Sequence, residues 1–262
     1  MKFKTTPYHH NLLKDKERLA IFLEAIKQFA TTNTNSNLTE FDIGCGSGIL
    51  SFFSQPYFKK ILAIEIDAKV ANYAKENLKE FKNIEIINAD AIDYEYPFKA
   101  DLIVCEMLDT ALIDEEQVPA LINAKKYLKD NGVIIPQAII NSAELVKMPR
   151  RNIHYDDVDS NTKYETISEE VFYNNIDFLD DLNPYFNKVI TFGIQKDSEV
   201  NGIKITTYTK LSDDIICGPT PMLNPPLLIP INKKYVKCND LINVRIKYHM
   251  GEGIQTIQVN YE

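Results

Sequence analysis

Hydrophobic and polar positions follow two different rhythms along this chain, and the change comes near residue 136. Before it, short apolar runs such as 61–66 and 101–105 alternate with segments like 70–81, where apolar residues recur every three or four positions. After it, stretches such as 203–208 and 241–248 alternate residue by residue and are separated by Gly, Pro and Asn. The first rhythm predicts strands and helices in turn, and the second predicts antiparallel strands.

The predicted fold is therefore α/β at the start and β-rich at the end. Residues 1–136 would form a mainly parallel sheet with helices on both faces, and residues 137–262 an antiparallel sandwich or barrel. Apolar spacing after Asp15 predicts an N-terminal helix with that aspartate as its N-cap. An acidic stretch at 156–181, with helical spacing over 167–179, predicts an inserted arm.

A glycine-rich turn is predicted between the first strand of the sheet and the helix after it. Gly44 and Gly46 can adopt positive φ and let the backbone approach a ligand closely, and Gly48 lets the next helix pack tightly. Asp42 precedes the first glycine, and a carboxylate there would repel a pyrophosphate and attract an amine. Alone, the pattern is equally explained by a tight strand–helix connection. The candidate ligand-binding residues of this stretch are Asp42, Gly44, Cys45, Gly46 and Gly48.

Acidic residues fall at the carboxyl ends of four of the predicted strands: Asp42, Glu65, Asp90 and Glu106. Ligands of open α/β sheets bind at the carboxyl ends of the strands, so these side chains should meet at one edge. Glu65 lies about 20 residues beyond the glycine turn, where nucleotide-binding folds place a carboxylate that accepts ribose hydroxyls. Its alternative is a surface acid at the sheet edge. Asp90 would bond an adenine amino group, itself or through neighbouring backbone, unless it is a simple turn aspartate.

The composition limits which classes of binding partner and which cellular compartment are expected. The formal net charge of −8 disfavours non-specific binding to nucleic acid or anionic membranes and favours a basic partner. The four cysteines are widely separated, without the paired spacing of a zinc site or a disulfide framework, which predicts no metal and reduced thiols in a cytoplasmic protein. No long uncharged apolar run or charged-then-apolar leader occurs, so neither a membrane span nor secretion is expected.

Two segments resemble a known class of enzyme. The pattern Asp-x-Gly-x-Gly-x-Gly at 42–48 resembles motif I of the class I S-adenosylmethionine methyltransferases. The resemblance implies a Rossmann-like seven-stranded methyltransferase core with S-adenosylmethionine as its cofactor. Residues 13–18, Leu-Lys-Asp-Lys-x-Arg, resemble the segment that precedes the core of the protein arginine methyltransferases. There an arginine grips the cofactor's methionine carboxylate, which implies the same role for Arg18.

A third segment resembles the double-glutamate loop of the same family. Glu106 is followed nine positions later by Glu115, after a methionine-containing loop and before a predicted helix. Two carboxylates in one pocket repel each other unless they share a cation, and a guanidinium is a permanently charged cation that fits two carboxylates. The resemblance implies catalytic roles for Glu106 and Glu115. Glu116 is the alternative partner if the loop is shifted by one, and a solvated acidic cluster at 114–116 is the other alternative.

The chain also departs from that family. Arginine methyltransferases have a Thr-His-Trp triplet in the β domain and a tryptophan after the first loop glutamate, whereas this chain has no tryptophan and no histidine at 218–227. The cofactor prediction stands, and the acceptor is open. The leading expectation is a basic protein substrate, methylated on a side chain. The alternatives are a small molecule, RNA, or a non-catalytic S-adenosylmethionine-binding module. The family also implies a homodimer, with the β-rich part serving substrate binding and dimerisation.

Overall fold

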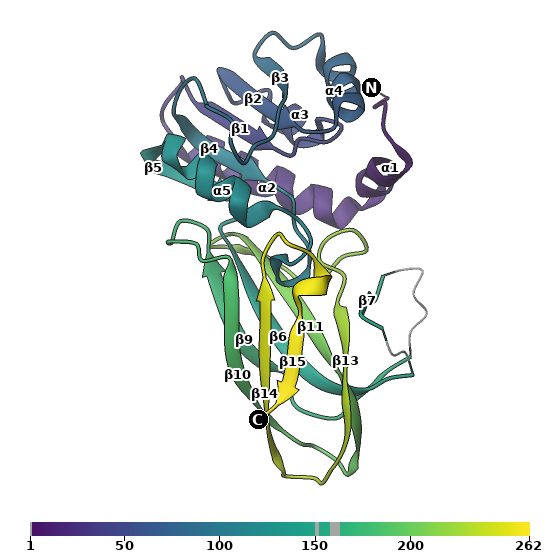
Figure 1. Cartoon of the computed structure of the whole chain (residues 1–262). Helices are drawn as coiled ribbons and strands as arrows, with labels where there is room; N and C mark the ends of the chain where they lie inside the picture. Colours follow the sequence, from purple (N-terminus) through teal and green to yellow (C-terminus); the bar gives the residue numbers. More distant parts are fainter. Residues whose placement is uncertain (1, 150–151, 158–162) are drawn as a thin grey trace.

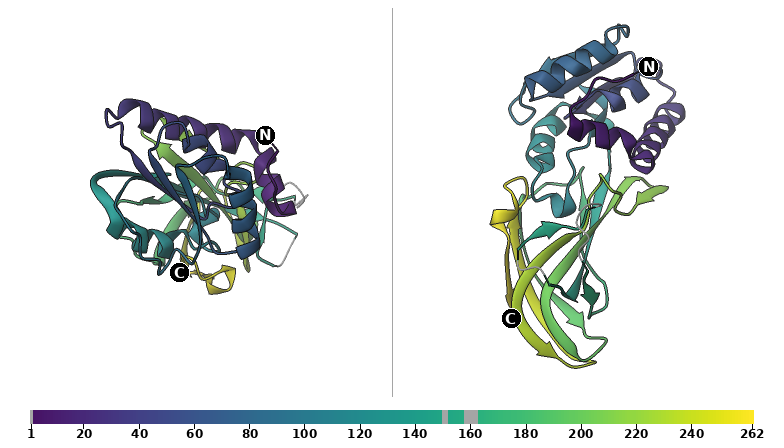
Figure 2. Two further views of the ribbon diagram at one scale, coloured as in Figure 1. Left: turned by 90° about the horizontal axis from the view of Figure 1, so that it is seen from above. Right: turned by 90° about the vertical axis from the view of Figure 1, so that its right-hand side faces the viewer.

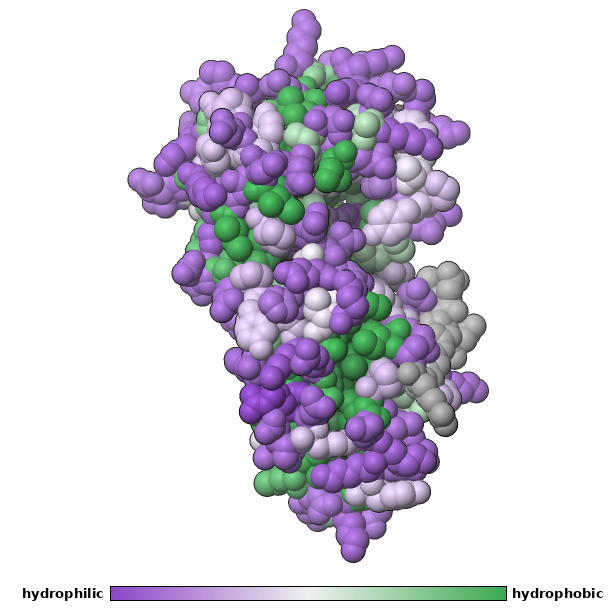
Figure 3. Space-filling model, in the orientation of Figure 1, coloured by the Kyte–Doolittle hydropathy of each residue, from purple (hydrophilic) through white to green (hydrophobic). Residues whose placement is uncertain are grey.

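The computed structural model describes residues 2–149, 152–157 and 163–262. Figure 1 shows an elongated molecule with an α/β part at the top and long antiparallel strands below, and Figure 2 shows the same two parts from above and from the side. No helix within the described residues is long and apolar enough to cross a membrane. On the face drawn in Figure 3 the surface is mostly hydrophilic, with smaller apolar patches on both the upper and the lower part of the molecule.

The α/β part is built on a parallel sheet whose strands lie in the order β3-β2-β1-β4-β5. The central strands are almost completely buried, because helices cover the sheet on both faces, and this explains their continuous apolar runs. The α/β fold is thus confirmed. The five strands are β1 (Thr39–Ile43), β2 (Lys60–Glu65), β3 (Ile84–Asn88), β4 (Ala100–Cys105) and β5 (Leu128–Ile135).

This sheet has five strands in the described chain rather than the seven that the resemblance implied. The reason lies in where the chain goes after β5. Beyond Pro136 it enters β6 (Ala138–Lys147), which pairs antiparallel with β11 (Ser198–Ser212) in a different sheet. The chain therefore does not return to add further strands to the parallel sheet.

The helices arise from clear end signals. Asp15 caps α2, accepting a hydrogen bond from the Arg18 N–H at 3.1 Å, which confirms the predicted N-cap. A helix before it, α1, was not predicted, although Thr6 at its N-cap and Pro7 at its first turn are recognised start signals. The α-helices are α1 (Pro7–Lys14), α2 (Lys16–Thr32), α3 (Ile49–Ser54), α4 (Ala68–Leu78) and α5 (Gln117–Ala124), and the 3-10 turns are η1 (Thr110–Leu112), η2 (Lys125–Tyr127) and η3 (Ile254–Thr256).

The β-rich part consists of two antiparallel sheets. The larger has the order β7-β13-β11-β6-β8, with β12 on β11 and β9 on β6, and the smaller has the order β10-β14-β15. One continuous apolar cluster extends from the parallel sheet into both of these sheets. The remaining strands are β7 (His154–Tyr155), β8 (Glu165–Thr166), β9 (Val171–Asp177), β10 (Tyr185–Gly193), β12 (Ile215–Cys217), β13 (Leu227–Val236), β14 (Leu241–His249) and β15 (Gln258–Tyr261).

The helical spacing over 167–179 was wrong, because this segment contains β9, which pairs with β6. A β-bulge explains the error. Asn174 lies opposite Asn141 and Phe172 opposite Ser142, so Tyr173 is an extra residue in β9. The bulge shifts the residue-by-residue alternation by one position and imitates a helical spacing. Part of the predicted arm at 156–181, namely 158–162, lies outside the described residues.

Candidate active site

A cavity of about 240 Å³ opens at the carboxyl ends of β1, β2, β3 and β4, beneath α1. The sheet order reverses between β1 and β4, which is the point where open α/β sheets bind ligands. Most of the predicted site residues lie together on its wall, while Asp42 and Gly48 do not line it. Those that do are Arg18, Gly44, Cys45, Gly46, Glu65, Asp90, Glu106 and Glu115.

Asp42 lies beneath the glycine turn rather than in the cavity. Its buried carboxylate accepts a hydrogen bond from the Ser51 N–H at 2.9 Å and another from the Ser51 hydroxyl. Burial raises the pKa of Asp42 to about 6, although the hydrogen bonds from Ser51 oppose the rise. The Asp42 carboxylate therefore does not reach a ligand in the cavity directly. Its hydrogen bonds to Ser51 hold α3 against β1 instead.

Gly48 serves helix packing. It has a φ of +86°, and a Cβ there would lie 2.6 Å from Leu78 Cδ1 in α4. Glycine at this position therefore lets α3 begin close to α4.

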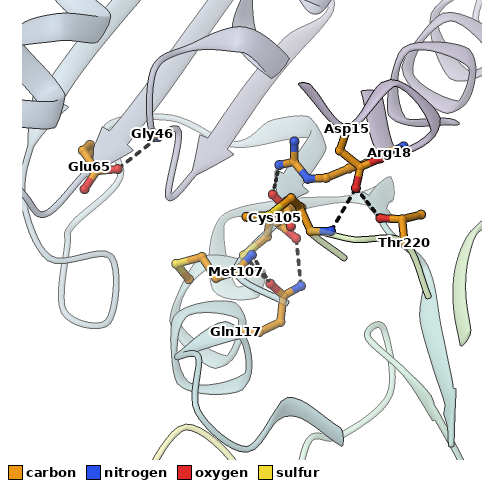
Figure 4. Close-up of polar contacts among 10 residues, drawn as sticks. Asp15, Arg18, Gly46, Glu65, Cys105, Met107, Gln117 and Thr220 are labelled. Atoms are coloured by element: carbon orange, nitrogen blue, oxygen red, sulfur yellow. Dashed lines mark hydrogen bonds and ion pairs between the residues drawn. The ribbon is translucent and has the colours of Figure 1, made fainter. Parts of the chain in front are cut away.

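Glu65 supports the glycine turn from β2. Its Oε2 accepts the Gly46 N–H at 3.0 Å (Figure 4). Its Oε1 accepts the Asp67 N–H at 2.9 Å. The side chain lines the cavity, and carboxylate oxygens can accept more than one hydrogen bond. Glu65 can therefore hold the turn and still accept hydroxyl groups from a ligand.

The glycine turn is covered by two side chains that the sequence did not single out. A Cβ on Gly44 would lie 2.6 Å from Met107 Cγ, and one on Gly46 would lie 2.8 Å from His9 Cδ2. Both covering residues line the cavity. His9 belongs to α1, and the start signal at Thr6 and Pro7 marks this helix in the sequence but not its place over the turn.

Arg18 and Glu106 form an ion pair inside the site (Figure 4). Arg18 donates from Nη2 to Glu106 Oε2, and the two side chains are only 4% and 9% exposed. Burial raises the pKa of Glu106, while the positive charge of Arg18 opposes the rise. The Nε and Nη1 atoms of Arg18 are buried and have no hydrogen-bond partner. Because buried donors are normally paired, these two fit an anion that enters the cavity.

Glu115 and Glu116 both line the cavity, Glu115 being the more buried. The pKa of Glu115 is raised, first by burial and then by the negative charge of Glu106. Asp90 is more exposed and accepts the Ile92 N–H at 2.9 Å in a turn, so its contact with a ligand stays a prediction.

The wall of the cavity carries mainly acidic side chains. Among the described residues of its wall, Arg18 is the only Lys or Arg, against Glu65, Asp90, Glu106, Glu115 and Glu116. Such a wall favours a ligand that carries positive charge. Within 2–149, 152–157 and 163–262, no group of three or more His, Cys, Asp or Glu side chains is arranged to hold a metal ion.

Gln117, at the start of α5, positions Glu106. It is fully buried, its Oε1 accepts the Met107 N–H at 2.9 Å, and its Nε2 donates to the Cys105 carbonyl at 2.8 Å (Figure 4). It thereby fixes the backbone on both sides of Glu106. A polar residue that begins an apolar helix was the sole sequence signal for this role.

Asp15 connects α2 to the loop before β13. Its Oδ2 accepts hydrogen bonds from the Thr220 hydroxyl and from the Met222 N–H at 3.0 Å. Met222 lines the cavity, so the β-rich part contributes to the site. This loop is the region where a Thr-His-Trp triplet was expected.

Comparisons with known proteins agree with this geometry. The family described as "Methyltransferase domain" matches residues 41–132. The chain is 43% identical to an uncharacterized protein of Methanothermobacter thermautotrophicus, over 99% of each chain. It is 24% identical to a probable protein arginine N-methyltransferase 6 of Arabidopsis thaliana, over 92% of this chain and 49% of the plant protein.

The fold matches a solved structure over almost its whole length. The Trypanosoma brucei PRMT1 enzyme–prozyme heterotetrameric complex with AdoHcy superposes with a TM-score of 0.79 at 16% identity, covering 98% of this chain and 96% of that chain. The chain therefore belongs to one family with the Methanothermobacter protein and is a class I S-adenosylmethionine-dependent methyltransferase that resembles the protein arginine methyltransferases.

Proposed function

We propose that this enzyme methylates a cationic side chain of a protein, with the guanidinium of arginine as the leading acceptor. The observation that supports the proposal most is the acidic wall of the cavity, where Glu106 is paired with Arg18, the only Lys or Arg of the described wall, and Glu115 lines the same wall. A guanidinium offers five N–H donors and a permanent charge, so it suits two carboxylates. The net charge of −8 is consistent with a basic protein partner.

We assign the cofactor contacts residue by residue, as proposals. Arg18 would bind the methionine carboxylate through its unpaired Nε and Nη1, and Glu65 would accept the ribose hydroxyls. The backbone of the turn from Gly44 to Gly48 would approach the aminocarboxypropyl group, and Asp90 would lie near the adenine. Residues 1–136 would thus form the cofactor-binding domain and 137–262 the substrate and dimerisation domain.

The chemistry requires alignment more than strong acid–base catalysis. Bound S-adenosylmethionine would supply an electrophilic methyl carbon; the acceptor nitrogen would form a bond to it as the C–S bond on the opposite side breaks, with S-adenosylhomocysteine as the leaving group. Glu106 and Glu115 would hold the acceptor so that its attacking nitrogen faces the methyl group, and they would concentrate its positive charge on the other nitrogens. The acceptor nitrogen would lose one proton to solvent during or after attack. A cavity covered by α1 also limits the access of water.

A protein acceptor with a different amine group is the second candidate. It is favoured by the loop before β13, which brings Met222 rather than a histidine or tryptophan to the cavity. Dimerisation and a cytoplasmic location are further proposals. Sedimentation at the working concentration tests the first, and fractionation of the source cells tests the second.

Labelled S-adenosylmethionine tests the proposed function in a lysate of the protein's own source. The comparison uses the wild type, Glu106→Gln, and Glu40→Gln as a matched control, because Glu40 is fully buried in β1 and does not line the cavity. We expect a discrete labelled protein with the wild type and the control and no label with Glu106→Gln. Mass spectrometry then identifies the modified side chain. Cofactor binding without any protein label would contradict the proposal.

A further inference from the structure

The loop that joins the two glutamates has an unfavourable backbone conformation. Ala111 and Leu112 both have a φ of +61°, in the left-handed region that residues other than glycine seldom adopt. Such a conformation persists only where surrounding contacts fix it. The position of Glu115, three residues further on, therefore depends on what holds this loop.

The side chain of Asp109 binds the backbone at the end of the loop. Its Oδ2 accepts the N–H groups of Ile113 at 3.0 Å and Asp114 at 2.9 Å, and its Oδ1 accepts the N–H of Glu115 at 3.2 Å. Three consecutive backbone donors thus point at one carboxylate, which is only 7% exposed. One of them is the amide of Glu115 itself, so Asp109 fixes the backbone from which that side chain extends.

Tyr155 in β7 braces Asp109 from the β-rich part. Its hydroxyl lies 3.0 Å from Asp109 Oδ2 and 2.7 Å from Asp114 Oδ2, within hydrogen-bonding distance of both. Asp114 Oδ1 in turn accepts the Ile254 N–H at 3.0 Å, just before β15. The loop is therefore tied to two separate segments of the β-rich part through side chains at its end.

We propose that Asp109, braced by Tyr155, is a positioning residue that sets where the Glu115 carboxylate stands in the cavity. Through Glu115 it controls the alignment of the cationic acceptor, and this step rests on the proposed function. Asp109 does not line the cavity, so it acts through the backbone of Glu115 and not by touching a ligand. Gln117, at the start of α5, fixes the backbone around Glu106 in a similar way.

The test compares Asp109→Ala and Asp109→Asn with the wild type. The asparagine keeps the size of the side chain and one accepting oxygen, and Tyr155→Phe removes the brace alone. Asp101→Asn is the matched control, because Asp101 also accepts a backbone N–H, from Thr39 at 2.8 Å, but its hydrogen bonds go to Thr39 and Lys129 and not to residues 113–115. Thermal unfolding of each variant establishes that it is folded. If Asp109→Ala does not fold, the same measurements are made on Asp109→Asn and Tyr155→Phe.

Three quantities are measured: amide hydrogen exchange at 113–115, affinity for S-adenosylhomocysteine, and affinity of that complex for N-acetyl-arginine amide. We expect Asp109→Ala to speed exchange at 113–115 and to weaken binding of the arginine probe, each by about tenfold or more, because three backbone N–H groups lose their acceptor. Affinity for S-adenosylhomocysteine should change by less than about twofold, because that ligand makes no use of Asp109. Asp109→Asn should restore part of both effects.

Unchanged exchange at 113–115 would overturn the proposal, and so would a parallel loss of S-adenosylhomocysteine affinity, which would indicate general damage to the site. If the wild type does not bind the arginine probe, the proposed function loses its support for arginine. In that case the amide exchange rates at 113–115 alone test whether Asp109 fixes the backbone of these residues.

Discussion

Arg18 in α2 is paired with Glu106 at the end of β4, and both side chains are buried. The two residues are 88 positions apart, so the pair joins the N-terminal helix to the centre of the site. Removing one member of a buried pair leaves an uncompensated charge, which is costly. The unpaired Nε and Nη1 of Arg18 add a second consequence, because the same guanidinium that orients Glu106 can also receive an anion.

Replacing Arg18 by glutamine should therefore affect stability and cofactor binding together. We expect the free energy of unfolding to fall by about 3 kcal/mol, because Glu106 loses its partner. Affinity for S-adenosylmethionine should fall by about 30-fold, the equivalent of about 2 kcal/mol for lost charge-assisted hydrogen bonds. Denaturant titration and calorimetry measure the two quantities. Lys60→Gln, on an exposed cation in β2, is the control, and unchanged cofactor affinity in Arg18→Gln would refute the carboxylate assignment.

Gly46 gives a steric test of the cover that α1 forms. A Cβ at this position would lie 2.8 Å from His9 Cδ2, and the φ of +53° disfavours any side chain. We expect Gly46→Ala to weaken S-adenosylmethionine binding by at least about tenfold. Gly218→Ala is the control, since its Cβ would be 3.8 Å from the Tyr208 ring, an ordinary contact.

Adding His9→Ala to Gly46→Ala separates the two causes of that loss. Recovery of part of the affinity would assign that part to the collision with His9, and the remainder to backbone strain. Normal affinity in the single variant would contradict the close approach of α1 to the glycine turn.

Asp42 should make stability depend on pH. Its pKa in the folded protein is about 6, above its ordinary 3.8, so the folded state holds the proton more tightly than the unfolded state. The resulting stabilisation is complete below pH 3.8 and is lost as pH rises through about 6. A shift of this size corresponds to about 3 kcal/mol.

Asp42→Asn removes this titration and keeps an oxygen that can accept the Ser51 N–H. The variant's free energy of unfolding, relative to wild type, should therefore rise between pH 4 and pH 7 by up to about 3 kcal/mol. Urea denaturation across this range measures it. A difference that does not vary with pH would show that burial does not control this carboxyl group.

Glu65 can be tested through the ligand rather than the protein alone. If its carboxylate accepts the ribose hydroxyls, the wild type should bind S-adenosylhomocysteine about tenfold more tightly than its 2′-deoxy analogue. Glu65→Gln keeps an acceptor for the Gly46 N–H and should reduce this preference. Equal preference in the wild type and the variant would refute the ribose assignment.

Much of the α/β part could be predicted, because local signals there coincide with tertiary structure. Buried parallel strands have continuous apolar runs, and three glycines with positive φ mark the turn that approaches the cavity. Acidic residues at the carboxyl ends of neighbouring parallel strands lie at one edge of the sheet, which brought Glu65, Asp90 and Glu106 together. Asp42 lies within β1, one residue before its end, and its side chain turns toward Ser51 instead of the cavity.

What could not be predicted depends on contacts between distant segments. The bulge at Tyr173 interrupts the apolar–polar alternation of β9 by one residue, and for this reason the sequence pattern was interpreted as a helix. Gln117, Asp109 and Tyr155 act through hydrogen bonds to backbone groups of other segments, and no spacing in the sequence marks such bonds. Pairing between Arg18 and Glu106 likewise appears only once α2 is placed against the sheet.

The most direct test of the account is the rate of S-adenosylhomocysteine formation with an arginine-rich peptide, compared with a lysine-rich peptide of the same length. Glu106→Gln and Glu115→Gln should each lower kcat/KM for the arginine peptide by about 100-fold or more, with S-adenosylmethionine affinity unchanged within about threefold and with Glu40→Gln like wild type. Full activity of either cavity variant on the arginine peptide would contradict the claim that these two carboxylates orient a cationic acceptor.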